Sequence, residues 1–86
     1  MEEILLTRLQ HPYLPSSGLM HLDRYVVYNL CLGPNEETVY VVLSEEVPRG
    51  YEASGYDKIR EVLRGSMYEN YNIEFVDENK YSIKYE

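Results

Sequence analysis

The sequence predicts an α+β domain in which one helix packs on one face of a small, mainly antiparallel sheet of about four to five strands. Three patterns indicate this architecture: two β-branched runs around a short turn, one stretch with helical spacing, and two strand-like runs near the C-terminal end. The expected order of elements is (β or α)–β–β–α–β–β.

The strongest strand signal runs from residue 23 to residue 32, where both faces are largely apolar, as is typical of a central strand. Residues 33–36 contain Gly, Pro and Asn, which favour a turn, and residues 38–43 form a second β-branched run. Two such runs on either side of a short loop predict an antiparallel hairpin.

The segment before this hairpin is less clear. Residues 3–10 are apolar but fit neither the strand period nor the helix period, so both a strand and a short helix remain open. Pro12 and Pro15 end this segment, and residues 16–18 are expected to form a loop.

One helix is predicted after a surface connection over residues 45–54. Ser54 and Asp57 nearly match a capping box, so we expect the helix to begin there. Apolar residues with helical spacing follow at Ile59, Val62, Leu63 and Met67. Gly65 either ends the helix as a C-terminal cap or lies inside it.

Two strands are predicted after the helix. Residues 72–76 place Ile73 and Phe75 on one face, and residues 77–80 are expected to turn the chain. Residues 81–86 then alternate apolar and polar side chains, which predicts a half-buried strand with one solvent-facing side.

Length and composition predict a single domain over residues 1–86. The chain carries 15 acidic and 8 basic residues, for a formal net charge of −7, and this negative charge disfavours direct nucleic-acid binding. One cysteine excludes an internal disulfide, and no apolar run approaches the roughly 20 residues that a membrane span requires. An acidic start at residues 1–3 does not resemble a secretory signal, so we expect a soluble, intracellular, cytoplasmic protein without membrane association.

No cofactor, metal site or catalytic group is predicted. The soft or borderline metal ligands at His11, His21 and Cys31 lack the dense spacing of a zinc site. Cys31 lies between two leucines in a strand, where a cysteine behaves as a small buried apolar residue. The acid pairs lie in predicted turns, where solvent does not supply the shifted pKa that catalysis needs.

Tyrosine is the unusual feature of the composition, with ten tyrosines, one phenylalanine and no tryptophan. Four of them are expected to face the core, at Tyr28, Tyr56, Tyr81 and Tyr85. Three others fall in or near loops or at the end of the helical pattern, at Tyr13, Tyr51 and Tyr68. Exposed tyrosines are enriched in protein interfaces, so these three are candidate contact residues.

The leading functional hypothesis is a small acidic protein-binding module, an inhibitor or regulator that docks on a basic surface of a protein partner. In its sharpest form the carboxylates stand where the phosphates of a nucleic acid would lie. In composition alone the chain resembles small acidic inhibitors of bacteriophages and archaeal viruses. The candidate interface residues are Tyr13, Glu36, Glu37, Glu45, Glu46, Tyr51, Tyr68, Asp77 and Glu78.

Two alternatives come from other functional classes. The domain could be a structural or accessory protein that forms a homodimer through an edge strand or the apolar segment at residues 19–20. It could also be a small enzyme that uses Cys31 or a histidine.

Overall fold

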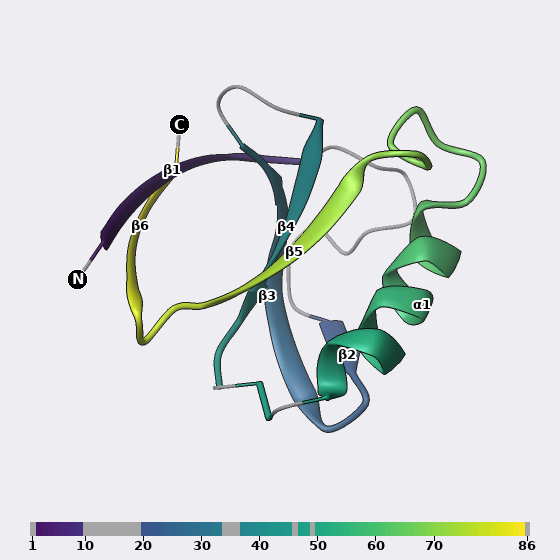
Figure 1. Cartoon of the computed structure of the whole chain (residues 1–86). Helices are drawn as coiled ribbons and strands as arrows, with labels where there is room; N and C mark the ends of the chain where they lie inside the picture. Colours follow the sequence, from purple (N-terminus) through teal and green to yellow (C-terminus); the bar gives the residue numbers. More distant parts are fainter. Residues whose placement is uncertain (1, 10–19, 34–36, 46, 49, 86) are drawn as a thin grey trace.

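A computed structural model describes residues 2–9, 20–33, 37–45, 47–48 and 50–85 (Figure 1). These residues form one α-helix and a six-stranded sheet, which confirms the α+β class. The elements are β1 (Glu2–Arg8), β2 (Met20–Leu22), β3 (Tyr25–Leu32), β4 (Thr38–Leu43), α1 (Tyr51–Leu63), β5 (Asn72–Asp77) and β6 (Tyr81–Tyr85). The sheet is larger than predicted because the first segment is a strand and residues 20–22 add a further short one.

The strand order is β5-β4-β3-β1-β6, and β2 pairs with the beginning of β3. The predicted β3–β4 hairpin is confirmed, and β3 also pairs antiparallel with β1 and β2. The prediction of a mainly antiparallel sheet is wrong in part, because β4 pairs with β5 and β1 pairs with β6 in parallel. Helix α1 returns the chain to the start of β4, which allows β5 to run in the same direction as β4.

Strong twist and curl distinguish this sheet from a flat one. Strands β5 and β6 lie at opposite ends of the strand order, although only residues 78–80 separate them in the chain. A twist of roughly 20–25° per strand pair accumulates to roughly 90° over four pairs, which turns the two end strands toward each other. Figure 1 shows β1 and β6 arching on one side of β3–β5, with α1 on the other side.

A β-bulge interrupts β3, where the pairing with β4 shifts register between Val27 and Asn29. The extra residue reverses the alternation of side chains, so Val27 and Leu30 both face the helix side. Tyr28 lies at the bulge and is 38 % exposed, so its predicted core position is wrong. A simple period of two could not reveal this shift.

Two apolar clusters lie on opposite faces of the sheet. The helix-side cluster consists of Leu9, Leu22, Tyr25, Val27, Leu30, Val39, Val41, Leu43, Ile59 and Leu63. The second cluster consists of Leu6, Cys31, Val42 and Val76, with partly buried residues of β1, β4 and β6 packed against it. The apolar character of both faces of β3 and β4 is thereby explained, since α1 covers one face and β1 with β6 the other.

The helix begins earlier than the capping pattern predicts. It starts at Tyr51 after Gly50, and no side chain caps its N-terminus by a hydrogen bond. Ser54 is therefore an exposed residue inside the helix, and the predicted start at Ser54 is wrong. At the other end, Gly65 has a φ of 81° and lies just beyond the helix, as the C-cap alternative predicted. Met67 lies outside the helix and is 76 % exposed.

Close approach of α1 to β5 depends on Gly55. A Cβ atom at this position would lie 2.9 Å from Cζ of Phe75 and 3.1 Å from Cε1 of Tyr51. The helix therefore rests directly on the ring of Phe75, and there is no room for a side chain between them.

We expect Gly55→Val to lower the free energy of unfolding by about 2 kcal/mol, because an added side chain separates α1 from β5. Urea denaturation followed by circular dichroism measures this change. The matched control is Ser54→Val on the exposed side of the same helix, where we expect a change within about 0.5 kcal/mol. Equal stability of the two variants would contradict the close contact.

Candidate protein-binding surface

Three exposed carboxylates lie at one end of the sheet, where β4 and β5 finish and β3 begins. Asp23 belongs to the turn between β2 and β3, Glu45 follows β4, and Glu78 follows β5. In Figure 1 the turn before β3 and the end of β4 lie at the bottom of the molecule, and the turn after β5 lies at the lower left. We call Asp23, Glu45 and Glu78 the acidic end.

Hydrogen bonds hold these turns in place. The Ser44 amide donates to the Val26 carbonyl oxygen over 3.1 Å, and the Glu78 amide donates to the Leu43 carbonyl oxygen over 3.1 Å. The Asn79 side chain donates from Nδ2 to the Ser44 carbonyl oxygen over 3.0 Å. The backbone that carries the carboxylates is thus fixed relative to the sheet, although the side chains are exposed to solvent.

Arg24 is the basic residue next to Asp23, and Tyr25 holds it. Its Nη2 atom donates to the Tyr25 hydroxyl over 3.2 Å, and its guanidinium carbon lies 5.3 Å from the centre of the Tyr25 ring. The Tyr25 hydroxyl raises the pKa of the Arg24 guanidinium, and the charges of Asp23 and Glu45 act in the same direction. In the described part of the chain, the ion pairs Glu61–Arg64 and Glu3–Lys84 use other carboxylates than those of the acidic end.

The predicted interface acids do not all gather at this end. Glu37 is exposed at the opposite end of the sheet, where its carbonyl oxygen accepts from the Asn72 amide over 2.9 Å. Asp77 is only 7 % exposed, and its Oδ1 atom accepts from the Asn79 amide over 2.8 Å. Asp77 therefore stabilises the turn after β5 and is poorly placed to contact a partner.

Two of the predicted interface tyrosines serve the interior. The Tyr51 hydroxyl donates to the Leu22 carbonyl oxygen over 2.7 Å, and its ring packs edge-on against Tyr25 at 4.6 Å between centroids. Burial raises the pKa of the Tyr51 hydroxyl. Tyr68 is half-buried against the helix-side cluster and packs edge-on against Tyr71 at 5.4 Å. These contacts within the domain account for the positions of Tyr51 and Tyr68 without a binding partner.

The more exposed tyrosines are instead three that the sequence assigned to the core. Tyr28, Tyr56 and Tyr85 are 38 %, 38 % and 40 % exposed, whereas Tyr81 is half-buried in the second cluster as expected. The bulge explains the exposure of Tyr28. Tyr56 lies beside the core-facing stripe of α1, which consists of Tyr51, Gly55, Ile59 and Leu63. At the end of β6, the Tyr85 hydroxyl accepts from Asn29 Nδ2 over 3.2 Å.

Several sequence predictions lie outside the described residues. These are the candidate contacts Tyr13, Glu36 and Glu46, together with His11 and Leu19. Asp23, in contrast, was not predicted as a contact residue. The two-residue turn Asp23–Arg24 could have revealed it, because aspartate tolerates the positive φ of 60° that this turn requires.

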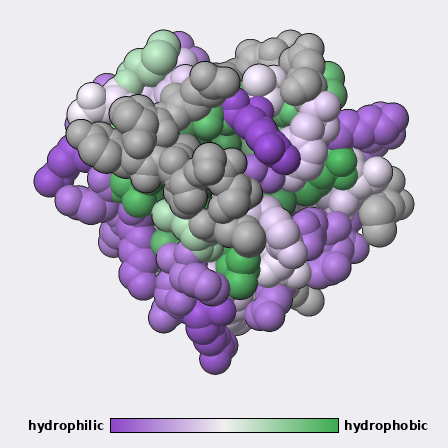
Figure 2. Space-filling view, turned by 180° about the vertical axis from the view of Figure 1, so that it is seen from behind, coloured by the Kyte–Doolittle hydropathy of each residue, from purple (hydrophilic) through white to green (hydrophobic). Residues whose placement is uncertain are grey.

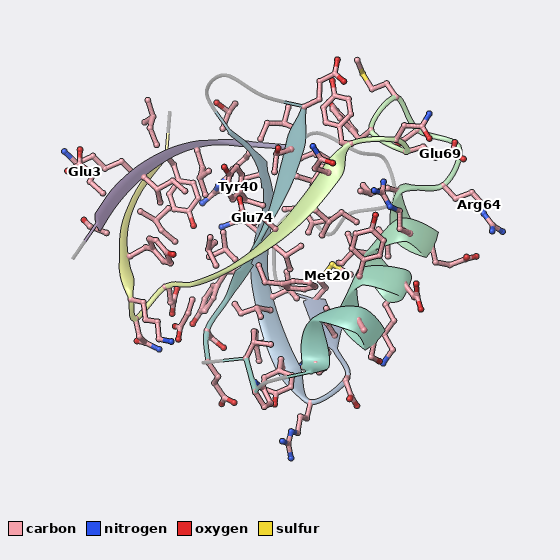
Figure 3. The ribbon with its side chains drawn as sticks, in the orientation of Figure 1. Glu3, Met20, Tyr40, Arg64, Glu69 and Glu74 are labelled. Carbon is pink, nitrogen blue, oxygen red and sulfur yellow. The ribbon has the colours of Figure 1, made fainter. Side chains whose placement is uncertain are left out.

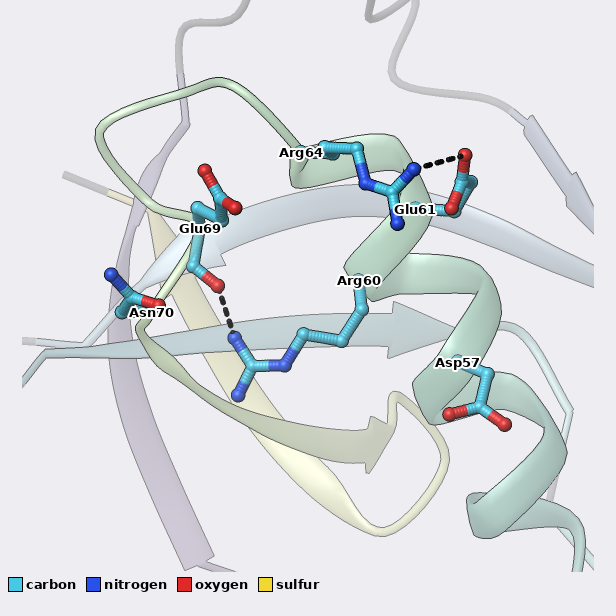
Figure 4. Close-up of a pocket in the computed structure, with 6 residues that line it drawn as sticks. All are labelled: Asp57, Arg60, Glu61, Arg64, Glu69 and Asn70. Carbon is cyan, nitrogen blue, oxygen red and sulfur yellow. Dashed lines mark hydrogen bonds and ion pairs between the residues drawn. The ribbon is translucent and has the colours of Figure 1, made fainter.

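A polar groove of about 490 Å³ lies between the C-terminal half of α1 and the loop that follows it (Figure 4). Its walls are Asp57, Arg60, Glu61, Arg64, Glu69 and Asn70. Arg60 is held firmly there, because it donates to the Tyr56 hydroxyl and to the Glu69 carbonyl oxygen, each at 2.5 Å. Small-molecule sites are predominantly apolar, so the polar walls of this groove do not favour a small-molecule site.

The surface seen from behind is mainly polar. Hydrophilic side chains dominate its outline, and the apolar ones appear only as small separate areas (Figure 2). The described part of this face therefore offers a partner polar contacts over most of its extent.

Cys31 is fully buried in the second cluster. Burial raises the pKa of its thiol to about 11, and the charge of Arg8 opposes this shift only in part. The thiolate is the nucleophilic form of cysteine, so this environment does not favour catalysis by Cys31.

We expect the Cys31 thiol to reduce stability at alkaline pH. Between about pH 9 and pH 11 the folded state keeps the proton, whereas the unfolded chain releases it, so stability falls as the pH rises. Relative to neutral pH, the loss at pH 10 is on the order of 1 kcal/mol. Urea denaturation at both pH values should show a smaller loss in Cys31→Ala. An identical pH dependence in both proteins would contradict the raised pKa.

The described residues contain no group of three His, Cys, Asp or Glu side chains that could hold a metal ion, and His21 is exposed on β2. Within the same residues, no helix has the length and apolar character needed to cross a membrane. Comparison with known protein families, curated proteins and solved structures finds no match to this chain.

Proposed function

We propose that this protein is a small protein-binding module that docks on a basic surface of its partner through the acidic end. The observation that carries the proposal is the placement of three exposed carboxylates, Asp23, Glu45 and Glu78, in three separate turns at the same end of the sheet. Charges on the surface attract a basic partner over about 8–10 Å at physiological salt. Such attraction increases association rates and selects partners by the sign of their charge.

Arg24 lies beside two of these carboxylates, and its charge interacts with those of Asp23 and Glu45. It offsets part of their field, while its hydrogen bond to the Tyr25 hydroxyl and its stacking on the Tyr25 ring fix where its charge lies. Because the turns are fixed by backbone hydrogen bonds, docking orders only a few carboxylate side chains. A low ordering cost favours binding.

In its sharper form the proposal is that of an inhibitor or regulator whose carboxylates take the place of phosphates on a nucleic-acid-handling protein. Support comes from the net charge of −7 and from the separation of the carboxylates over three turns. The buried, protonated Cys31 favours binding over the alternative of a cysteine nucleophile.

The test combines affinity capture from the host lysate with a triple variant, Asp23→Asn, Glu45→Gln and Glu78→Gln. We expect the captured partner to bind the triple variant with an association rate about tenfold lower at low salt, because the steering charges are lost. Surface plasmon resonance at low and high salt measures this rate for each protein.

The matched control is Glu3→Gln, Asp57→Asn and Glu61→Gln, which changes the net charge equally on β1 and α1. This control should bind the partner within about threefold of the original protein, since surface substitutions of this kind have small effects. An affinity that does not change with salt, or an equal loss in both triple variants, rules out docking through the acidic end.

A further inference from the structure

Among the described residues, no strand pairs with one side of β5, because β4 lies on its other side and β6 pairs with β1 instead. The amides of Asn72 and Glu78 donate to carbonyl oxygens on the β4 side. Since successive residues of a strand alternate, Ile73 and Phe75 direct their backbone N–H and C=O groups to the open side. In the described part of the chain, no turn or loop hydrogen bond uses these groups.

Open strand edges are normally protected against pairing with another chain. The other edge strands of this sheet, β2 and β6, both have such protection. Strand β2 has three residues, and β6 carries Lys84 in its outward-facing row. Short length and lysine are both devices that prevent edge-to-edge pairing. Strand β5 has six residues in continuous register with β4 and contains no lysine, proline or bulge. The charge in its middle is the carboxylate of Glu74, which repels an acidic strand but not a basic one.

The side chains of β5 define the chemistry of a strand that could pair with it. Glu74 is exposed in the middle of the strand, on the side away from α1 and near Tyr40 (Figure 3). A side chain directly opposite Glu74 would lie about 4.5–5.5 Å away, where lysine or arginine is favourable. On the other face, Ile73 and Phe75 are half-buried, so apolar side chains are favourable beside them.

A second copy of this chain does not match that chemistry. Antiparallel pairing of two β5 strands through their open groups can be centred on residue 74, 75 or 76. These registers place Glu74 opposite a second Glu74, opposite Val76 or opposite Glu78. None of them provides a positive charge, and two of them place like charges together, which is destabilising.

We infer that the open edge of β5 accepts an extended segment of a partner protein in which basic and apolar residues alternate. The segment adds a strand to the sheet, its backbone pairs with Ile73 and Phe75, and a lysine or arginine pairs with Glu74. This inference rests on the proposed function, since both require a basic protein partner. It assigns the contact to a particular strand and to a backbone mode of recognition.

The probe is an eight-residue peptide of alternating lysine and valine with blocked ends, titrated to about 1 mM. Nuclear magnetic resonance should show shifts along β5 and slower hydrogen exchange at the amides of Ile73 and Phe75. We expect Glu74→Lys to weaken peptide binding at least tenfold, because the lysines then meet a like charge. For the same reason, a glutamate–valine peptide should bind this variant more tightly than it binds the original protein.

Two controls separate backbone pairing from general attraction. The first is Glu3→Lys, which changes the net charge equally on the distant strand β1 and should alter the affinity less than threefold. The second is the same peptide with alternate backbone nitrogens methylated, which keeps its charge but cannot donate hydrogen bonds to β5. We expect this methylated peptide to lose binding.

The outcomes distinguish this inference from the proposed function. If the methylated peptide binds equally well, or if only the acidic-end triple variant loses binding, the β5 edge is not the site and docking through the acidic end stands. Absence of any binding overturns the β5 inference as well. A third outcome is that the peptide slows hydrogen exchange at the amides of Ile73 and Phe75, but no partner with salt-dependent affinity is captured from the lysate. This outcome supports the β5 edge as a site and contradicts the acidic-end proposal.

Discussion

Strands β3 and β4 carry apolar side chains on both faces, and a sheet with two apolar faces must be covered on both sides. The described residues form one helix, α1, which covers only one of these faces. The sheet covers the other by curling, so that β1 and β6 pack their inward residues on the second cluster. The parallel β1–β6 pair and the separation of β5 from β6 both follow from this constraint.

The direction of the strands determines where the charged turns lie. Because β4 and β5 are parallel neighbours, their carboxyl ends meet at one end of the sheet, together with the start of β3. Asp23 therefore lies at the same end of the sheet as Glu45 and Glu78, although it is 55 residues away from Glu78 in the chain. Glu37 precedes β4 and so lies at the other end. Proximity between acidic residues is thus a consequence of strand direction and not of their spacing in the sequence.

Local patterns predicted the elements well but not their pairing. The β3–β4 hairpin, the helix and the two last strands depend on nearby residues, whereas the pairing of β6 with β1 joins opposite ends of the chain. The tyrosine assignments failed for a related reason. A bulge at Tyr28 changes which side chains of β3 face inward, and a tertiary hydrogen bond to the Leu22 carbonyl oxygen draws Tyr51 toward the core. Three of the acids, Glu37, Glu45 and Glu78, are exposed outside the strands as predicted, whereas Asp77 is the last residue of β5.

The acidic end and the open edge of β5 are continuous, since Glu78 directly follows Asp77 at the end of that strand. Long-range attraction by the acidic end is weakly directional, so by itself it selects a partner only by charge. Backbone pairing along β5 is directional but acts only at contact. Together, attraction by the acidic end would bring a basic segment to the end of the sheet, and backbone pairing along β5 would fix the register of this segment beside Glu74. Residues 34–86 carry twelve acids and six bases, and three of these acids, Glu45, Glu74 and Glu78, lie on β5 or in the turns at its end.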